Sequence, residues 1–169
     1  MEELRQVVFT MNRDSAAGPD GIGGKFYQAC WIIIKQDLLA AVQSFFCGNT
    51  MPKFLIHACL VLLPKTKQPI RFRDILPISL SNFTNKIISK LLSMRLATVF
   101  PLLLSDNQSG FVRGRSITES IILAQEITHG IKKPQIGNNV VIKLDMAKAY
   151  DRVSWSFICL VLRIFGFGE

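Results

Sequence analysis

The chain has 169 residues, of which 49% are hydrophobic and 19% are charged. This length suits one domain and the apolar content is enough for a packed core, which excludes an intrinsically disordered chain. Lysine and arginine total 20 against 12 acidic residues, and the net charge of +8 favours a polyanionic partner only slightly over a basic, solvated surface. No apolar run approaches the roughly 20 residues of a membrane helix, so we expect no membrane partner.

The cysteines and histidines do not indicate a metal site. Four cysteines are scattered without a CxxC spacing, and the two histidines stand alone, which argues against zinc. Each cysteine lies in an apolar run, as small buried side chains of a reducing compartment do. The acidic, amphipathic N-terminus is not a signal peptide, and with no targeting signal seen we expect an intracellular protein.

The first part of the chain predicts helices separated by a turn. An amphipathic helix opens the chain, and the glycine-rich segment 15–24 (SAAGPDGIGG) ends it. A long helix follows over 25–46, with Gly48 as its C-terminal cap. The apolar face of the first helix consists of Leu4, Val7, Val8 and Met11.

The middle of the chain predicts a strand, a basic loop and a helix. Leu60 to Leu63 indicate a buried strand that ends at Pro64, and the proline-punctuated residues 65–79 indicate an exposed loop or irregular hairpin. A helix is predicted over 82–99, followed by a loop over 105–115. The buried stripe of that helix consists of Ile87, Ile88, Leu91, Leu92 and Leu96.

The last part predicts a helix, a buried strand and a final helix. Ser116 and Glu119 form a capping box before a helix that carries an apolar stripe. A turn over 137–139 leads to a buried strand over 140–146, and Ser154 caps a last helix over 155–165. Because helices and strands alternate without a regular βαβ rhythm, we expect an α+β fold. The stripe consists of Ile121, Ile122, Leu123 and Ile127.

Asp145 is the most informative single residue. A carboxylate at the end of an apolar strand costs free energy unless a partner or a metal compensates it, and strand ends that open into clefts often carry metal-binding carboxylates. Lys148, Tyr150 and Asp151 follow closely. The alternative, that Asp145 only caps a turn or the next helix, remains open from the sequence and is the commoner case.

Two basic groups are the other candidates. One loop carries four cations, and in another Arg113 and Arg115 flank Gly114. Such loops can hold phosphates, although a solvated charge run is an equal alternative. The glycines of 15–24 lack the spacing of a phosphate-binding loop, so a plain turn is the better interpretation. The four cations of the first loop are Lys65, Lys67, Arg71 and Arg73.

These segments, in this order, resemble the reverse transcriptase of plant non-LTR retrotransposons (long interspersed elements). The resemblance covers most of the chain from about residue 15. It rests on SAAGPDG, LLPKTKQP, LPISLSN and NKIISKLLSMRL, and above all on QSGFVRGRS and KLDMAKAYDRV. It implies a right-hand polymerase fold, with fingers over about 1–135 and the start of the palm over 136–169. It also implies RNA template, DNA primer and dNTPs as partners, and nothing in the sequence indicates a protein partner.

The resemblance assigns roles to single residues. Asp145 would be the first of three aspartates that hold two divalent metals, usually Mg²⁺, for nucleotidyl transfer to a primer 3′-hydroxyl. Tyr150 would contact the incoming sugar, and Lys65, Arg73 and Arg115 would contact the nucleotide. Asp151 and Arg152 match the family pattern but are given structural roles. Residues implied to contact nucleic acid are Lys67, Arg71, Gln108, Gly110, Phe111, Arg113 and Gly114.

Two departures from the family pattern bear on activity. Leu76 stands where the family has an arginine that contacts the triphosphate, and only Arg73 lies near enough to replace it. The chain contains no Asp-Asp pair, so we expect a fragment that stops before the second aspartate motif, binds Mg²⁺ weakly and does not polymerise alone. The alternatives are a non-catalytic RNA- or DNA-binding module and a degenerate retroelement product without activity.

Overall fold

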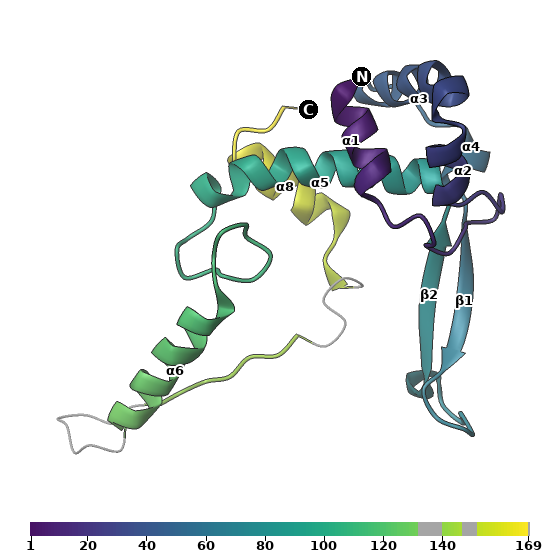
Figure 1. Ribbon diagram of the computed structural model, residues 1–169. Helices are drawn as coiled ribbons and strands as arrows, with labels where there is room; N and C mark the ends of the chain where they lie inside the picture. Colours follow the sequence, from purple (N-terminus) through teal and green to yellow (C-terminus); the bar gives the residue numbers. More distant parts are fainter. Residues whose placement is uncertain (132–139, 147–151, 169) are drawn as a thin grey trace. The chain divides into compact units, whose positions relative to one another are not determined.

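The computed structural model describes residues 1–131, 140–146 and 152–168 (Figure 1). These form two compact units, Met1–Leu96 and Ala97–Glu169. Helices predominate, and the strands form one two-stranded antiparallel sheet. This confirms the expected mixture of helices and strands. The predicted boundary between fingers and palm, at 135/136, lies outside the described residues. No helix in the described part of the chain is long and apolar enough to cross a membrane.

The first unit is built mainly of helices and a hairpin (Figure 1). In chain order the elements are α1 (Glu2–Thr10), α2 (Gly24–Ala29), α3 (Trp31–Phe46), α4 (Lys53–Ile56), β1 (Ala58–Pro64), the 3₁₀ turn η1 (Phe72–Asp74), β2 (Ile75–Ser81) and α5 (Phe83–Leu103), whose last residues belong to the second unit.

The core of the first unit comes from the helical faces predicted by periodicity, except that Leu92, which was predicted to be buried, is 38% exposed. Leu4, Val7 and Val8 of α1 are buried with the α5 residues Ile87 and Leu91. Aromatic rings add to it: the ring centroids of Tyr27 and Phe83 lie 4.9 Å apart, and Trp31 contacts the half-exposed ring of Phe9 at 6.0 Å. Burial of apolar area on these faces is the main stabilising term for the unit.

The predicted helix over 25–46 is corrected to two helices. Cys30, with φ −92° and ψ 12°, separates α2 from α3. The interruption is short, because the Cys30 N–H still donates to Phe26 and its carbonyl accepts from Ile34. The C-terminal cap is confirmed. Gly48 adopts φ +84°, which favours glycine, and the Asn49 N–H closes the helix on the Ser44 carbonyl at 3.1 Å.

The β1–β2 hairpin corrects the expected burial of residues 60–63. The strand is present, with Ala58 opposite Ser81 and Pro64 opposite Ile75. However, Leu60 and Leu62 are more than half exposed. A two-stranded ribbon has two faces, and most side chains of both strands stay open to solvent. Prolines are tolerated here because each strand has an unpaired edge.

A buried asparagine joins the SAAGPDG turn to the start of α5. Asn82 is 1% exposed, and its Nδ2 donates to the Phe54 carbonyl at 2.7 Å while its Oδ1 accepts from the Asp20 N–H at 3.3 Å. Gly18 packs so closely that a Cβ there would lie 2.3 Å from the Asn82 Oδ1. Lys86 adds a bond from its Nζ to the Ala16 carbonyl at 2.6 Å. Two of the segments behind the family resemblance, SAAGPDG and LPISLSN, therefore meet in one contact.

The second unit contains the end of α5, α6 (Ile117–Ile131) and α8 (Trp155–Ile164). The predicted cap at Ser154 is present, since its Oγ accepts from the Phe157 N–H at 3.2 Å. Ser116 Oγ accepts from the Thr118 N–H at 3.2 Å, rather than from Glu119 as a capping box requires. The expected burial of the apolar stripe on α6 is not observed. The α6 stripe at Ile121, Ile122, Leu123 and Ile127 is about half exposed at each position.

The buried strand predicted over 140–146 is also wrong. Residues 140–146 have no regular secondary structure and are exposed. A strand requires a partner for its backbone N–H and C=O groups, and no described residue pairs with this segment. An apolar run alone is therefore not sufficient to predict a strand. The turn predicted over 137–139 lies outside the described residues.

We predict that Asn82→Ala lowers the free energy of unfolding by about 2–3 kcal/mol. The substitution removes two hydrogen bonds and leaves the Phe54 carbonyl and the Asp20 N–H unsatisfied next to a cavity. Urea denaturation measures the change, with Asn85→Ala in the first turn of α5 as the control. Equal stabilities of the two variants would show that the Asn82 contacts contribute nothing beyond those of a half-buried amide.

Candidate nucleic-acid interface

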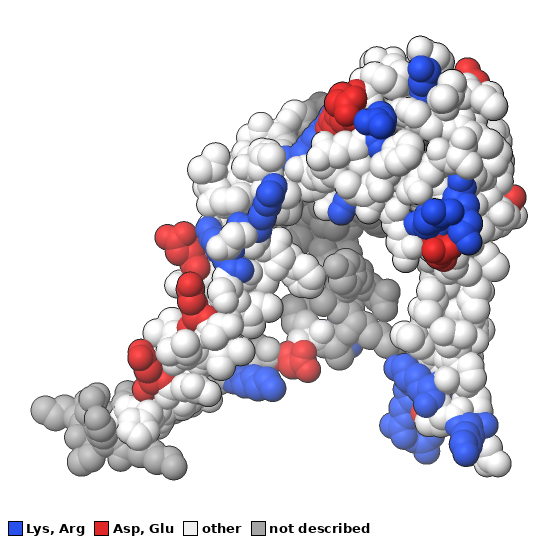
Figure 2. Space-filling model, in the orientation of Figure 1, with Lys and Arg blue, Asp and Glu red and all other residues white. Residues whose placement is uncertain are grey.

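The free end of the β1–β2 hairpin concentrates positive charge. Figure 2 shows lysine and arginine gathered there, and the residues are the predicted Lys65, Lys67, Arg71 and Arg73. All four side chains are exposed, and Asp74 is the only acidic residue in 65–74, so the segment carries 4 − 1 = +3. The hairpin extends away from the helices of its unit (Figure 1), which leaves this charge open to a ligand.

Asp74 gives the basic segment a defined shape. Its Oδ2 accepts hydrogen bonds from the Ile70 N–H at 3.3 Å and the Arg71 N–H at 3.0 Å. Its carbonyl accepts from the Lys65 N–H at 2.7 Å, which closes the loop at the end of the ladder. The Asp74 carboxylate therefore accepts hydrogen bonds from backbone N–H groups. It lies 3.9 Å from Arg73 Nε, too far for a strong ion pair. The sequence analysis did not single out Asp74.

Leu76 lies in the ladder rather than in the basic segment. It pairs with Leu63 across the strands, and its side chain is about half exposed. Arg73, the residue expected to replace the family's arginine, belongs to η1 and precedes the strand. The structure brings Arg73 together with the other three cations of the hairpin.

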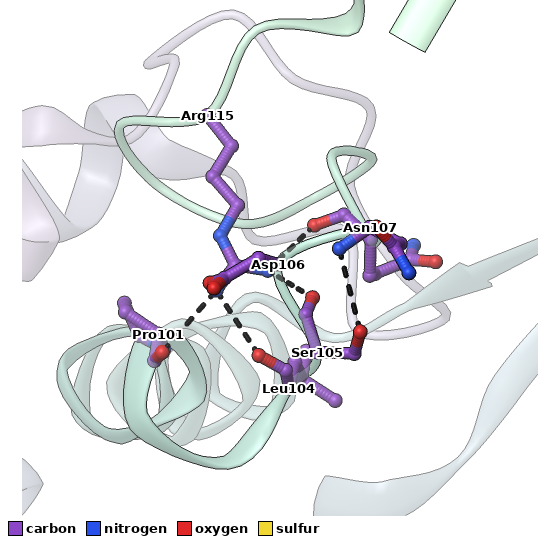
Figure 3. Close-up of polar contacts among 7 residues, drawn as sticks. Pro101, Leu104, Ser105, Asp106, Asn107 and Arg115 are labelled. Carbon is purple, nitrogen blue, oxygen red and sulfur yellow. Dashed lines mark hydrogen bonds and ion pairs between the residues drawn. The ribbon is translucent and has the colours of Figure 1, made fainter. Parts of the chain in front are cut away.

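The loop over 105–115 in the second unit is organised by Arg115 (Figure 3). Its Nη1 donates to the carbonyls of Ser105 and Gln108, the latter at 2.8 Å. Its Nη2 reaches the carbonyls of Pro101 at 3.2 Å and Leu104 at 3.0 Å, together with Asp106 Oδ1 at 3.2 Å. The guanidinium thus satisfies carbonyls at the C-terminal end of α5, where the helix leaves them unpaired.

Arg115 and Arg113 therefore occupy different environments. The Arg115 side chain is only 17% exposed and its Nη groups are engaged. Arg113 is exposed and has no ion pair within the described ranges. Of these two predicted phosphate contacts, Arg113 is exposed to solvent, whereas Arg115 binds backbone carbonyls within the loop. Its predicted contact to the nucleotide stays a prediction.

The remaining predicted loop residues have distinct backbone roles. Gln108 donates from Nε2 to the Gly110 carbonyl at 3.1 Å. Gly114 adopts φ +84°, a conformation that side chains disfavour. Phe111 is fully exposed, whereas its neighbour Val112 is 5% exposed. Sequence reasoning did not select Val112.

Asp145 lies in the exposed segment 140–146, and the described residues form no metal site around it. No three histidine, cysteine, aspartate or glutamate side chains converge anywhere in 1–131, 140–146 or 152–168. One exposed carboxylate does not fit a two-metal centre, which needs several oxygen ligands. Tyr150 and Asp151 lie outside the described residues. The roles of Asp145 and Tyr150 stay predictions.

The comparisons with known proteins identify the family. Residues 63–169, more than half of the chain, match the model of the reverse transcriptase (RNA-dependent DNA polymerase) family. The chain belongs to the reverse transcriptase family. This confirms the reverse transcriptase part of the assignment based on QSGFVRGRS and KLDMAKAYDRV, both of which fall within the match. Reverse transcriptases generally use divalent metal ions, nucleic-acid templates and nucleotide substrates.

One relative extends the similarity to the N-terminal residues. The chain is 28% identical over 168 residues to the transposon TX1 uncharacterized 149 kDa protein of Xenopus laevis. The match covers 99% of this chain and 13% of the relative, so the chain spans about an eighth of that protein's length. Similarity over nearly the whole chain includes the SAAGPDG turn, which lies ahead of the family match.

We predict that Arg115→Met loosens the loop of this reverse transcriptase chain while Arg113→Met does not. Removing the Arg115 guanidinium frees four backbone carbonyls. Three of these contacts are open to solvent, so each of them contributes less than the roughly 1.5–3 kcal/mol of a charge-assisted hydrogen bond shielded from water. Amide hydrogen exchange over 105–115 should accelerate at least tenfold in the Arg115 variant. Unchanged protection there would contradict the organising role of Arg115.

Proposed function

We propose that this chain is the nucleic-acid-holding part of an RNA-directed DNA polymerase from a plant non-LTR retrotransposon. In the complete protein the reaction is templated nucleotidyl transfer from dNTPs to a DNA primer on an RNA template. The observation that carries this proposal is the exposed hairpin of net charge +3 in a chain of the reverse transcriptase family. Similarity to a transposon protein supports the mobile-element origin.

The hairpin has the properties of a phosphate-binding element. Four cations on one ribbon release condensed counterions when they neutralise phosphates, which supplies affinity without sequence selection. Two of the four cations are arginines, whose planar guanidinium groups can bind phosphate oxygens through two hydrogen bonds. Exposed Ile70 and Phe72 lie between these cations and can contact sugars or bases. Within a right-hand polymerase fold, we assign this hairpin to the fingers.

The chemical step is assigned to the region around Asp145. By family resemblance Asp145 is a ligand for Mg²⁺, and Tyr150 contacts the sugar of the incoming nucleotide. We place this region at the start of the palm, in an intracellular protein of the nucleus or cytoplasm. The sequence has no Asp-Asp pair, so we infer that Asp145 alone does not assemble a two-metal centre.

A competing function is nucleic-acid binding without chemistry. It is favoured by the same hairpin and by the single exposed carboxylate of segment 140–146. The two functions share the interface and differ only in whether nucleotides are incorporated. Binding and incorporation must therefore be measured separately.

We predict that replacing Lys65, Lys67 and Arg71 by glutamine reduces the salt dependence of single-stranded RNA binding. Removing three phosphate contacts should lower the slope of log K against log salt by about 2. Fluorescence anisotropy at several salt concentrations measures the slope. The matched control replaces Arg13, Lys53 and Lys90, three exposed cations elsewhere in the first unit. Equal slopes for both triple variants would refute the hairpin as the interface.

We predict that the chain alone binds a primed RNA template but does not extend the primer with dNTPs and Mg²⁺. A single carboxylate cannot fix two metal ions about 3.5–4 Å apart. Incorporation is measured by gel electrophoresis of a labelled primer, with Asp145→Ala as the control. Incorporation that disappears in the control would show a complete catalytic centre within this chain and contradict the prediction.

A further inference from the structure

Strand β1 of the hairpin has an open hydrogen-bonding edge. The Lys65 N–H donates to the Asp74 carbonyl at 2.7 Å, directly beyond the strand pair Pro64–Ile75. Backbone hydrogen bonds between antiparallel strands join every second pair, so this bond fixes which N–H and C=O groups point toward the other strand and which point away. In the described part of the chain β1 pairs only with β2, and its outward groups meet no further strand. The outward-pointing residues of β1 are Ala58, Leu60, Leu62 and Pro64, opposite Ser81, Ser79, Pro77 and Ile75 of β2.

The outer edge of β2 is closed at the end nearer the basic segment. The Ile75 N–H donates to the Phe72 carbonyl within η1, and Pro77 has no N–H to donate. A proline at an outward-pointing position is one way in which proteins prevent a strand from pairing with another chain. On β1 only Pro64, the last residue, is of this kind, and the three outward-pointing residues before it keep their donors. The edge of β1 is therefore the one that can accept a further strand.

The side chains of β1 suit a strand identical to itself. Residues 58–64 (ACLVLLP) carry no charge, and Leu60 and Leu62 are 64% and 57% exposed. A charged strand would lose hydration beside these leucines, whereas a second copy places leucine next to leucine. Each outward-pointing residue before Pro64 offers one donor and one acceptor, so antiparallel pairing about a two-fold axis satisfies the same groups in both copies.

The charge at the end of the hairpin selects the antiparallel arrangement. Parallel pairing would bring the basic segments 65–74 of two copies together, each with a charge of +3. Antiparallel pairing centred on Leu60 or Val61 separates the Lys65 residues of the two copies by roughly 27–34 Å, at about 3.4 Å per residue. That distance is several times the Debye length at physiological salt, so the two basic segments do not repel each other appreciably.

We propose that the outer edge of β1 binds the same edge of a second copy of this chain. The two hairpins form one antiparallel four-stranded sheet across a two-fold axis, with strand order β2-β1-β1-β2 and the basic segments at opposite ends. The N–H groups of Ala58, Leu60 and Leu62 in each copy donate across the axis. Strand pairing alone covers a small surface, so we expect a dissociation constant of roughly 10–100 μM. This inference does not depend on the proposed function, because it requires no nucleic acid.

The test compares proline substitutions on the two edges of the hairpin. Leu60→Pro removes an outward N–H and leaves the hydrogen bonds between β1 and β2 intact, as Pro64 and Pro77 already do at equivalent positions. Ser79→Pro is the matched control, because Ser79 lies directly opposite Leu60 and its N–H points away from β1. In sedimentation velocity over a range of concentrations, Leu60→Pro should weaken dimerisation at least tenfold. Ser79→Pro should dimerise within twofold of the wild type.

Amide hydrogen exchange locates the interface and reports on the fold of the hairpin. Protection of the Leu60 and Leu62 N–H groups should rise with protein concentration in the wild type, as they become hydrogen-bonded across the axis. The Leu63 N–H, which faces Leu76 within the hairpin, should be protected at every concentration and in the Leu60→Pro variant. Protection of Leu63 in that variant shows that weaker dimerisation does not result from loss of the hairpin.

Salt dependence tests the orientation of the two copies. Because the basic segments lie far apart in the antiparallel arrangement, the dissociation constant should change less than twofold between about 0.05 and 0.5 M salt. Dimerisation that strengthens steeply with salt would indicate adjacent basic segments and overturn the antiparallel sheet.

Three other results would overturn the inference. The first is a chain that stays monomeric, with rapid exchange of the Leu60 N–H at every concentration. The second is dimerisation that Leu60→Pro leaves unchanged, since the interface would then lie on another surface. The third is an equal loss of dimerisation in Leu60→Pro and Ser79→Pro, since the edge of β2 would then contribute as much as that of β1.

Discussion

The buried contact between Gly18 and Asn82 is the constraint on which the first unit depends. An asparagine at 1% exposure requires partners for its amide, and the Phe54 carbonyl and the Asp20 N–H supply them. Gly18 is required because no Cβ fits against the Asn82 backbone. Asn82 directly follows β2 and precedes α5, so the contact fixes where the hairpin leaves the helices. A loop that resembles a phosphate cradle by composition is instead a packing element that orients the basic hairpin.

Arginines in this chain divide between structural and surface roles, and the division follows from their surroundings. Arg95 forms a two-pronged pair with Glu3, at 2.9 and 2.8 Å, and lies over the Phe46 ring at 4.4 Å. Its hydrogen bonds hold the pKa of Glu3 below the ordinary range. Arg115 binds carbonyls at the end of α5. Arg71, Arg73 and Arg113 remain exposed. The net charge of the chain therefore overstates the positive charge that is accessible to a polyanion.

The exposed apolar surface of the second unit reflects how secondary structure depends on tertiary partners. The α6 stripe and segment 140–146 both carry the periodicity or run of apolar residues that predicted burial. In the structure they are about half exposed or more. Helix α6 forms nonetheless, because its hydrogen bonds are internal and Ser116 caps it. Segment 140–146 remains without regular structure, because a strand has no internal hydrogen bonds to replace those of a missing partner.

The sequence by itself determined the features that depend on near neighbours. The face of α1, most of the face of α5, the caps at Gly48 and Ser154, and the basic composition of 65–74 all follow from local spacing, and the family follows from the order of its motifs. Only the tertiary structure decided which residues meet across long separations. It placed Gly18 against Asn82, engaged Arg115 rather than Arg113, and gave Phe111 a left-handed conformation. These choices depend on packing and hydrogen-bond geometry between segments, and residue type and spacing do not encode them.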